Sequence, residues 1–362
     1  MTTLMQASRQ WATRPAEERF TSLPQMRAKL EDLRANSRAL VVSSRRLGVV
    51  PTPDNKGLVI EGPQGNPAAP SNWAFGQLAA LSGAPASYLR SLPAPLAADC
   101  LNYGLKIERD AIDTGVLLTR GSDGVQLRAA TGPRYGRIWN VDVVRALEDR
   151  FGDGVTGDFR VPAEFGQRVP ITQANTTLFA GDRDMFVFLA DEVNRIELPN
   201  RRDGKTGELA RGFFVTNSET GASALKIKTF LFDYVCSNRI VWGAHELDEI
   251  SIRHTASAPD RFLEEAAPAL LEYSRASASN ITTALRAAQS AKLEKVDQFL
   301  ASRFGPRVAS RIKAVHEQEE GRPIETAWDA ITGATAYARS IPWTADRVEF
   351  EASAGDILDW AA

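Results

Sequence analysis

Residues 116–128 read Val-Leu-Leu-Thr-Arg-Gly-Ser-Asp-Gly-Val-Gln-Leu-Arg, which places two short apolar runs on either side of a tight turn. Glycine and aspartate at the centre of such a stretch supply the positive φ and the local hydrogen bonds of a hairpin turn. The sequence therefore predicts an antiparallel β-hairpin over 115–131. Asn140 is then expected to cap a helix over 141–151.

Further strand patterns surround this hairpin, and helical patterns follow them. Strands are expected at 39–43, 47–50, 57–61, 176–180, 185–190, 211–217 and 224–233. After residue 257 the apolar period becomes helical, with helices expected over 257–291, 292–304, 306–319 and 324–338. Strands first and helices last predict an α+β protein. We expect antiparallel hairpins packed with helices in a β-β-β-α-like core, followed by a helical C-terminal region.

Composition along the chain predicts three parts. Residues 1–62 are expected to hold an N-terminal helix and short strands, and the Gly/Pro/Ala-rich stretch 62–70 is expected to be a linker. Residues 71–256 are predicted to form the α+β core with basic β-hairpins. Residues 257–362 are predicted to form the helical region, which closes on an acidic end.

The overall charge excludes a protein held on nucleic acid by bulk positive charge alone. The 362 residues include 43 Lys+Arg and 45 Asp+Glu, for a net charge of −2. Three His and two Cys are too few for a structural zinc site of the usual spacing, so no cofactor is predicted. No apolar run approaches the ~20 residues that span a bilayer. A soluble, intracellular protein without a membrane partner is therefore expected.

Motif strings that would indicate an enzyme are incomplete or misplaced. Gly152-Asp-Gly-Val-Thr-Gly157 matches a dinucleotide fingerprint as a string, but it follows a predicted helix and is better explained as a helix C-cap and a turn. Asp182 and Asp184 offer oxygen ligands for Mg²⁺, yet Gly181-Asp-Arg-Asp184 is typical of a hairpin turn. We predict no catalytic residues and assign no metal site. A metal-dependent nuclease that uses Asp182 and Asp184 stays as the last alternative.

Basic residues interleaved with aromatic ones are the positive evidence for function. In Leu225-Lys-Ile-Lys228, strand alternation places Leu225 and Ile227 on one face and the two lysines on the other. Cations that follow a phosphate backbone, with flat rings that accept any base, are typical of single-strand binding. The alternative is a solvated sheet face whose charges protect an edge. The predicted phosphate contacts are Arg120, Arg128, Arg134, Arg137, Lys226, Lys228 and Arg239, and the predicted stacking rings are Tyr135, Trp139 and Trp242.

One motif resembles a known family. Residues 212–223 read Gly-Phe-Phe-Val-Thr-Asn-Ser-Glu-Thr-Gly-Ala-Ser, and residues 230–243 read Phe-Leu-Phe-Asp-Tyr-Val-Cys-Ser-Asn-Arg-Ile-Val-Trp-Gly. The Asn-Ser-Glu-x-x-Gly turn and the Cys-x-Asn step resemble the phage/plasmid-like domain of unknown function 932 family, over roughly residues 40–360. The resemblance implies carriage on mobile elements and supplies no catalytic residues. We expect Asn217, Glu219 and Gly221 to form a structural turn, and Cys236 and Asn238 to hold the sheet together.

These observations lead to one main hypothesis for function and two alternatives. By topology alone, the chain is also similar to single-strand annealing recombinases, which form rings or filaments around single-stranded DNA. The main hypothesis is therefore a phage- or plasmid-encoded, non-catalytic single-stranded DNA-binding protein of the bacterial cytoplasm, active in annealing or recombination as a homo-oligomer. A host replication or defence protein is a further expected partner. The first alternative is an interaction protein that inhibits a host defence or regulatory factor, and the second is the nuclease described above.

Overall fold

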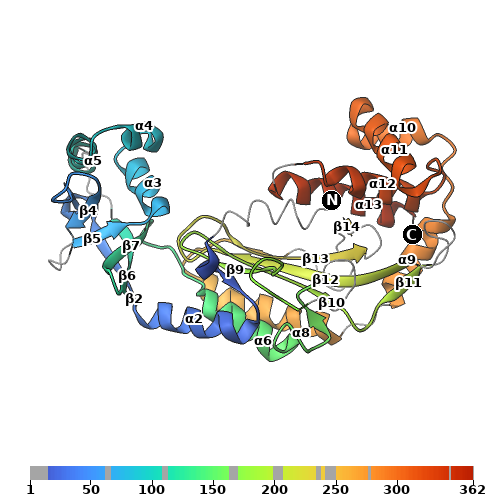
Figure 1. Cartoon of the computed structure of the whole chain (residues 1–362), viewed down its shortest axis with the longest axis horizontal. Coiled ribbons are helices and arrows are strands. Elements are labelled where there is room, and N and C mark those ends of the chain that lie inside the picture. The colour runs from blue at the N-terminus through green and yellow to red at the C-terminus, as the bar shows by residue number, and fades with distance from the viewer. Residues whose placement is uncertain are drawn as a thin grey trace.

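The structure is a computed structural model, which describes residues 15–61, 67–107, 113–162, 170–198, 207–233, 238–240, 250–275, 279–341 and 344–361. It contains two β-sheets and a group of C-terminal helices, so the predicted α+β class with a helical C-terminal region is confirmed. Figure 1 shows the first sheet at one end of the molecule and helices α10–α13 gathered at the other. Within the described residues, no helix has the length and apolar character needed to cross a bilayer.

The first sheet comes from the N-terminal third of the chain. Its six strands lie in the order β2-β6-β7-β5-β4-β3, and three helices pack on one face of it. The strands are β2 (Ser37–Ser43), β3 (Gly48–Pro51), β4 (Leu58–Glu61), β5 (Pro67–Pro70), β6 (Asp113–Gly121) and β7 (Gly124–Thr131). The helices are α3 (Asn72–Leu81), α4 (Ala86–Ser91) and α5 (Ala94–Ile107), and η2 (Ser44–Arg46) joins β2 to β3. The β6–β7 pair confirms the predicted hairpin.

The predicted boundary between residues 1–62 and 71–256 does not divide this fold, because strands from both sides of it share one sheet. The stretch predicted as a linker contains β5, which pairs antiparallel with β4 and parallel with β7. Pro67-Ala-Ala-Pro70 carries no strand signal of its own. Its conformation depends on the neighbouring strands, and Ala68 is buried between them.

The second sheet is larger and carries the family motif. It has nine strands: six follow the path β1-β9-β10-β12-β13-β14, and β8, β11 and β15 pair with β10, β12 and β13. The strands are β1 (Arg19–Phe20), β8 (Phe159–Arg160), β9 (Leu178–Ala180), β10 (Met185–Asp191), β11 (Ile196–Leu198), β12 (Gly207–Asn217), β13 (Leu225–Asp233), β14 (Asn238–Ile240) and β15 (Ile250–Ile252). The predicted turn 181–184 joins β9 to β10, where Gly181 N donates to Asp184 O at 3.0 Å.

One face of the second sheet packs on helices from three parts of the chain (Figure 1). They are α2 (Leu23–Ala35), α6 (Asn140–Phe151), and the consecutive segments α7 (Ala258–Arg261), the π-helical turn η5 (Phe262–Ala266) and α8 (Ala267–Arg275). The short η1 (Ala16–Glu18) precedes β1. Leu225 and Ile227 are buried on this face, whereas Lys226 is exposed on the other, which confirms the predicted alternation. Gly152, with φ +77°, caps the C-terminus of α6 as expected.

The C-terminal helices pack on one another and on strands β11, β12 and β13 of the second sheet. The helices are α9 (Ser279–Ser290), α10 (Val296–Phe304), α11 (Pro306–Glu320), α12 (Ala327–Ala338) and α13 (Thr344–Ala361). The single helix predicted over 257–291 is divided into α7, η5, α8 and α9. The sequence pattern did not predict α13 and indicated only a short acidic end there. The sequence of α13 shows little amphipathic pattern because the fold buries both apolar and charged residues of this helix, among them Glu351 and Ile357.

Candidate nucleic-acid interface

The turn between β12 and β13, residues 217–223, joins the two sheets and is called here the 217–223 turn. Glu219 lies in it, and its side chain is 3% exposed. Glu219 Oε2 accepts a hydrogen bond from Arg128 Nη1 on β7 at 3.0 Å, and Oε1 accepts one from the backbone N of Asn140 at 2.8 Å. A buried ion pair therefore connects the first sheet to the second sheet and to the start of α6.

Further polar groups of the 217–223 turn bind α3 and the segment before α6. Thr220 O accepts hydrogen bonds from Trp73 Nε1 at 3.0 Å and from Gln77 Nε2 at 2.7 Å, both on α3. Asn217 Nδ2 donates to Ile138 O at 2.9 Å. Gly221 has φ +90°, where a side chain would be strained.

Of the motif residues expected to be structural, Asn217, Glu219 and Gly221 all lie in the 217–223 turn. Cys236 lies outside the described residues. Asn238 is the first residue of β14, where only the backbone is described.

Arg128, predicted to contact phosphate, is not available for that role because its side chain is buried against Glu219. A β-bulge produces this arrangement. Leu117 pairs with Ala129 and Leu118 pairs with Leu127, so Arg128 has no opposite residue on β6. A bulge redirects the side chain of the extra residue. The prediction depended on basic residues interleaved with aromatic ones beside this hairpin, and that pattern does not reveal a bulge, so the prediction was wrong.

The rings predicted to stack on nucleobases are already engaged within the chain. Tyr135 stacks on His254 with ring centroids 4.7 Å apart, and its hydroxyl donates to Ser218 O at 2.7 Å. Burial raises the pKa of this phenol well above its usual range. The guanidinium groups of Arg34 and Arg137 lie 5.3 and 5.7 Å from the centre of the Trp139 ring. Tyr135 and Trp139 therefore position neighbouring side chains, and the predicted stacking role is corrected.

Arg137, another predicted phosphate contact, is half-buried and bound to the 217–223 turn. Its Nε donates to Glu219 O at 2.7 Å. Burial lowers the pKa of Arg137, and the nearby Tyr135 and Glu219 oppose that shift. Its guanidinium group holds the turn and lies near the Tyr135 and Trp139 rings. The sequence predicts an exposed phosphate contact at this position, and the side chain is instead half-buried.

Two predicted phosphate contacts, Arg134 and Lys226, are exposed and share one corner with a third cation, Arg253. Gly136 N donates to His254 O at 3.2 Å, so the loop that carries Arg134 packs against the segment that carries Arg253. Arg253 directly follows β15, in which Ser251 lies opposite Lys226. We call Arg134, Lys226 and Arg253 the cationic corner. Within the described part of the chain, no carboxylate pairs with these three side chains.

The other predicted contacts do not join the cationic corner. Arg120 is exposed at the end of β6, in the first sheet, where its backbone N donates to Asn36 O at 3.0 Å. Lys228 is half-buried on β13, two residues from Lys226. Arg239 is described only by its backbone in β14, and Trp242 lies outside the described residues. No sequence pattern indicated Arg253, because it is a single charge after a short strand.

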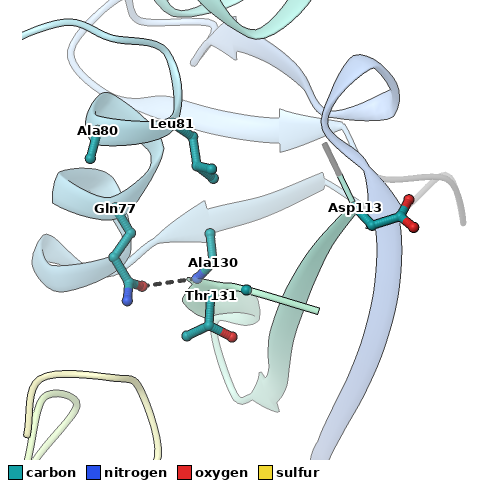
Figure 2. Close-up of a pocket in the computed structure, with 7 residues that line it drawn as sticks. Gln77, Ala80, Leu81, Asp113, Ala130 and Thr131 are labelled. Carbon is teal, nitrogen blue, oxygen red and sulfur yellow. Dashed lines mark hydrogen bonds between the residues drawn. The ribbon is translucent and has the colours of Figure 1, made fainter. Parts of the chain in front are cut away.

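No catalytic constellation accompanies these residues in the part of the chain that the structure describes. No three His, Cys, Asp or Glu side chains there lie close enough to hold a metal ion, so Asp182 and Asp184 have no third ligand among them. A pocket of about 350 Å³ lies between α3 and the β6–β7 hairpin (Figure 2). Its lining includes one carboxylate, Asp113, and the Gln77 amide, whose Oε1 accepts from Ala130 N at 2.9 Å. This lining offers no acid–base pair.

His254 makes the stability of the corner dependent on pH. Its Nδ1 donates to Gly136 O at 3.0 Å, and burial lowers the pKa of the imidazole below 6.5, with the charge of Arg137 acting in the same direction. Because the pKa is lower in the folded state, the unfolded chain takes up the proton first. We expect the free energy of unfolding to fall as the pH decreases from 6.5 towards the folded-state pKa. Denaturant titrations across this range should show a smaller decrease for His254→Gln, and an equal decrease would contradict the assignment.

This geometry defines the class of protein. It is an α+β protein whose two sheets are joined by a buried polar turn, and it carries an exposed cationic corner. Residues 170–347 match the family described as domain of unknown function (DUF932). The resemblance predicted over 40–360 is thus confirmed over this segment, which contains the 217–223 turn and most of the second sheet. It is a family of the phage and plasmid type. No curated protein and no solved structure matches the chain.

Proposed function

We propose that the chain is a phage- or plasmid-encoded protein that binds single-stranded DNA through its phosphates, in an annealing or recombination role and without catalysing a reaction. The observation that supports this proposal is the cationic corner, where three exposed cations lie on segments that pack together and have no carboxylate partner among the described residues. Such a cluster attracts a polyanion even though the net charge of the chain is −2.

The engaged aromatic rings determine the expected mode of binding. Since Tyr135 and Trp139 contact neighbouring side chains, base stacking on them is not part of the proposal. Contacts to phosphate alone carry no sequence information. Binding should therefore be independent of base sequence, sensitive to salt and modest for a single protomer.

The test is a salt titration of oligonucleotide binding. For single strands the logarithm of affinity falls with the logarithm of salt concentration with a slope of about −0.7 for each neutralised phosphate. Removing all three charges in Arg134→Gln/Lys226→Gln/Arg253→Gln should reduce the magnitude of the slope by about 2 and weaken binding at least ~10-fold at low salt. Fluorescence anisotropy with a labelled oligonucleotide measures both quantities.

A control with the same change in net charge separates the corner from general electrostatics. Lys295→Gln/Arg307→Gln/Arg311→Gln removes three exposed cations, one from the residue before α10 and two from α11. We expect this variant to keep the affinity and the slope of the natural sequence. If both variants behave alike, or if the natural sequence does not bind at low ionic strength, the proposed function is wrong.

A further inference from the structure

A groove with a volume of about 570 Å³ runs between α6 and the helical segments α7, η5 and α8. We call it the α6 groove. Four guanidinium groups line it, from Arg34, Arg137, Arg145 and Arg150, together with the carboxylates of Asp142 and Asp149. The groove therefore presents both signs of charge, with an excess of positive charge.

Within the described residues, Arg34 and Arg145 are each paired with a carboxylate, whereas Arg137 and Arg150 are not. Arg34 lies 2.6 Å from Asp142, and Arg145 lies 2.8 Å from Glu31. Arg150 donates from Nη1 to Ala146 O at 3.0 Å, and its Nε is buried without a hydrogen-bond partner in the described part of the chain. A buried donor of this kind costs free energy unless an acceptor reaches it. The groove thus has the donors for an acidic group that comes from outside the protomer.

The wall opposite the arginines is apolar. Pro259, Phe262 and Leu263 line it, and Leu263 is 65% exposed at the rim. A large exposed apolar side chain beside arginines that have no carboxylate partner among the described residues is typical of the centre of a protein–protein contact, where aromatic and Arg anchors carry most of the energy.

The end of α13 has the complementary composition. Asp356 and Asp359 are exposed there, and Trp360 is 50% exposed. The Trp360 ring lies edge-on against Phe299 at 4.8 Å, and the guanidinium of Arg303 lies 5.6 Å from its centre. This surface, which we call the α13 end, therefore offers acidic groups and a projecting indole, with one cation beside them.

We propose that the α6 groove of one protomer receives the α13 end of a second copy of this chain. Trp360 packs against Leu263 and Phe262, and the acidic residues of the α13 end face Arg137 and Arg150. Arg303 then approaches the groove carboxylates. The mixed charge of the groove favours a protein surface over nucleic acid, because a polyanion would also meet Asp142 and Asp149.

The symmetry of the assembly follows from the positions of the two surfaces. The α6 groove and the α13 end are different surfaces of the same chain, so the contact is heterologous, and repeated contacts generate a ring or a filament. This inference does not depend on DNA binding, because self-association is measured without nucleic acid, and oligonucleotide binding enters only as a control.

The test uses two variants, each of which keeps one half of the contact. Trp360→Ser removes the indole and keeps the groove, and Arg150→Glu reverses the charge in the groove and keeps the α13 end. We expect the natural sequence to associate with increasing concentration in light scattering after chromatography. Each variant alone should associate about 30-fold more weakly, the effect of losing one hot-spot residue. Mixed together, they should form a 1:1 pair that does not grow, because one intact groove meets one intact α13 end.

Controls make each outcome decisive. Arg120→Glu, an exposed charge reversal in the first sheet, should associate like the natural sequence, and thermal unfolding should show that all variants are folded. The proposal is overturned if the natural sequence stays monomeric at all concentrations, if either variant associates normally, or if the mixture forms no pair. It is also overturned if Arg150→Glu weakens oligonucleotide binding without any change in mass.

Discussion

Replacing Glu219 by alanine is expected to destabilise the protein by about 3–5 kcal/mol, the usual cost of removing one partner from a buried ion pair. The loss is large because Arg128 would keep its charge at 2% exposure with no acceptor opposite Nη1. The backbone N of Asn140 at the start of α6 would lose its acceptor as well. Denaturant unfolding followed by circular dichroism measures the change in the free energy of unfolding.

Two further variants distinguish the effect of breaking the ion pair from the effect of removing a side chain. Arg128→Met with Glu219→Leu removes both charges and should recover a large part of the stability, because no unpaired charge remains buried. Asp123→Ala removes an exposed carboxylate from the same hairpin as Arg128 and should have little effect. A Glu219→Ala protein within about 1 kcal/mol of the natural sequence would show that this ion pair contributes no more than a surface pair.

Gly136→Ala should disrupt both the fold and the cationic corner. A Cβ at residue 136 would lie 1.8 Å from Thr255 O, so the loop and the segment after β15 would have to separate. We expect a loss of about 3 kcal/mol in the free energy of unfolding, the upper range for an overpacked site. Oligonucleotide binding should weaken severalfold, because Arg134 would move away from Arg253. Denaturant unfolding and the anisotropy assay measure the two effects.

The matched control for this substitution lies in the same loop. Gly132→Ala adds the same methyl group, but a Cβ at residue 132 meets no atom within 4 Å. We expect its stability and binding to equal those of the natural sequence. If Gly136→Ala were as stable as Gly132→Ala, the close packing of the two segments would not be what holds the corner together.

Local patterns predicted the elements well, and they did not predict which cations are buried. The turn residues of 121–124 and the alternation of 225–228 were sufficient to predict β6, β7 and the buried face of β13. No local pattern indicated the burial of Arg128, because a bulge is a property of two paired strands. β5 was missed because Pro67-Ala-Ala-Pro70 becomes a strand only between its neighbours.

The sequence by itself determined the fold class, the β6–β7 hairpin, the β9–β10 turn and the family resemblance, since period and turn chemistry act over a few neighbouring residues. Only the tertiary structure decided which cations are exposed. Arg128 and Arg134 are both arginines beside one hairpin, yet Glu219, 91 residues after Arg128, buries and neutralises the first while the second remains exposed. The energy of a charged side chain depends on the solvent and the partners around it, and these are set by segments far apart in the chain.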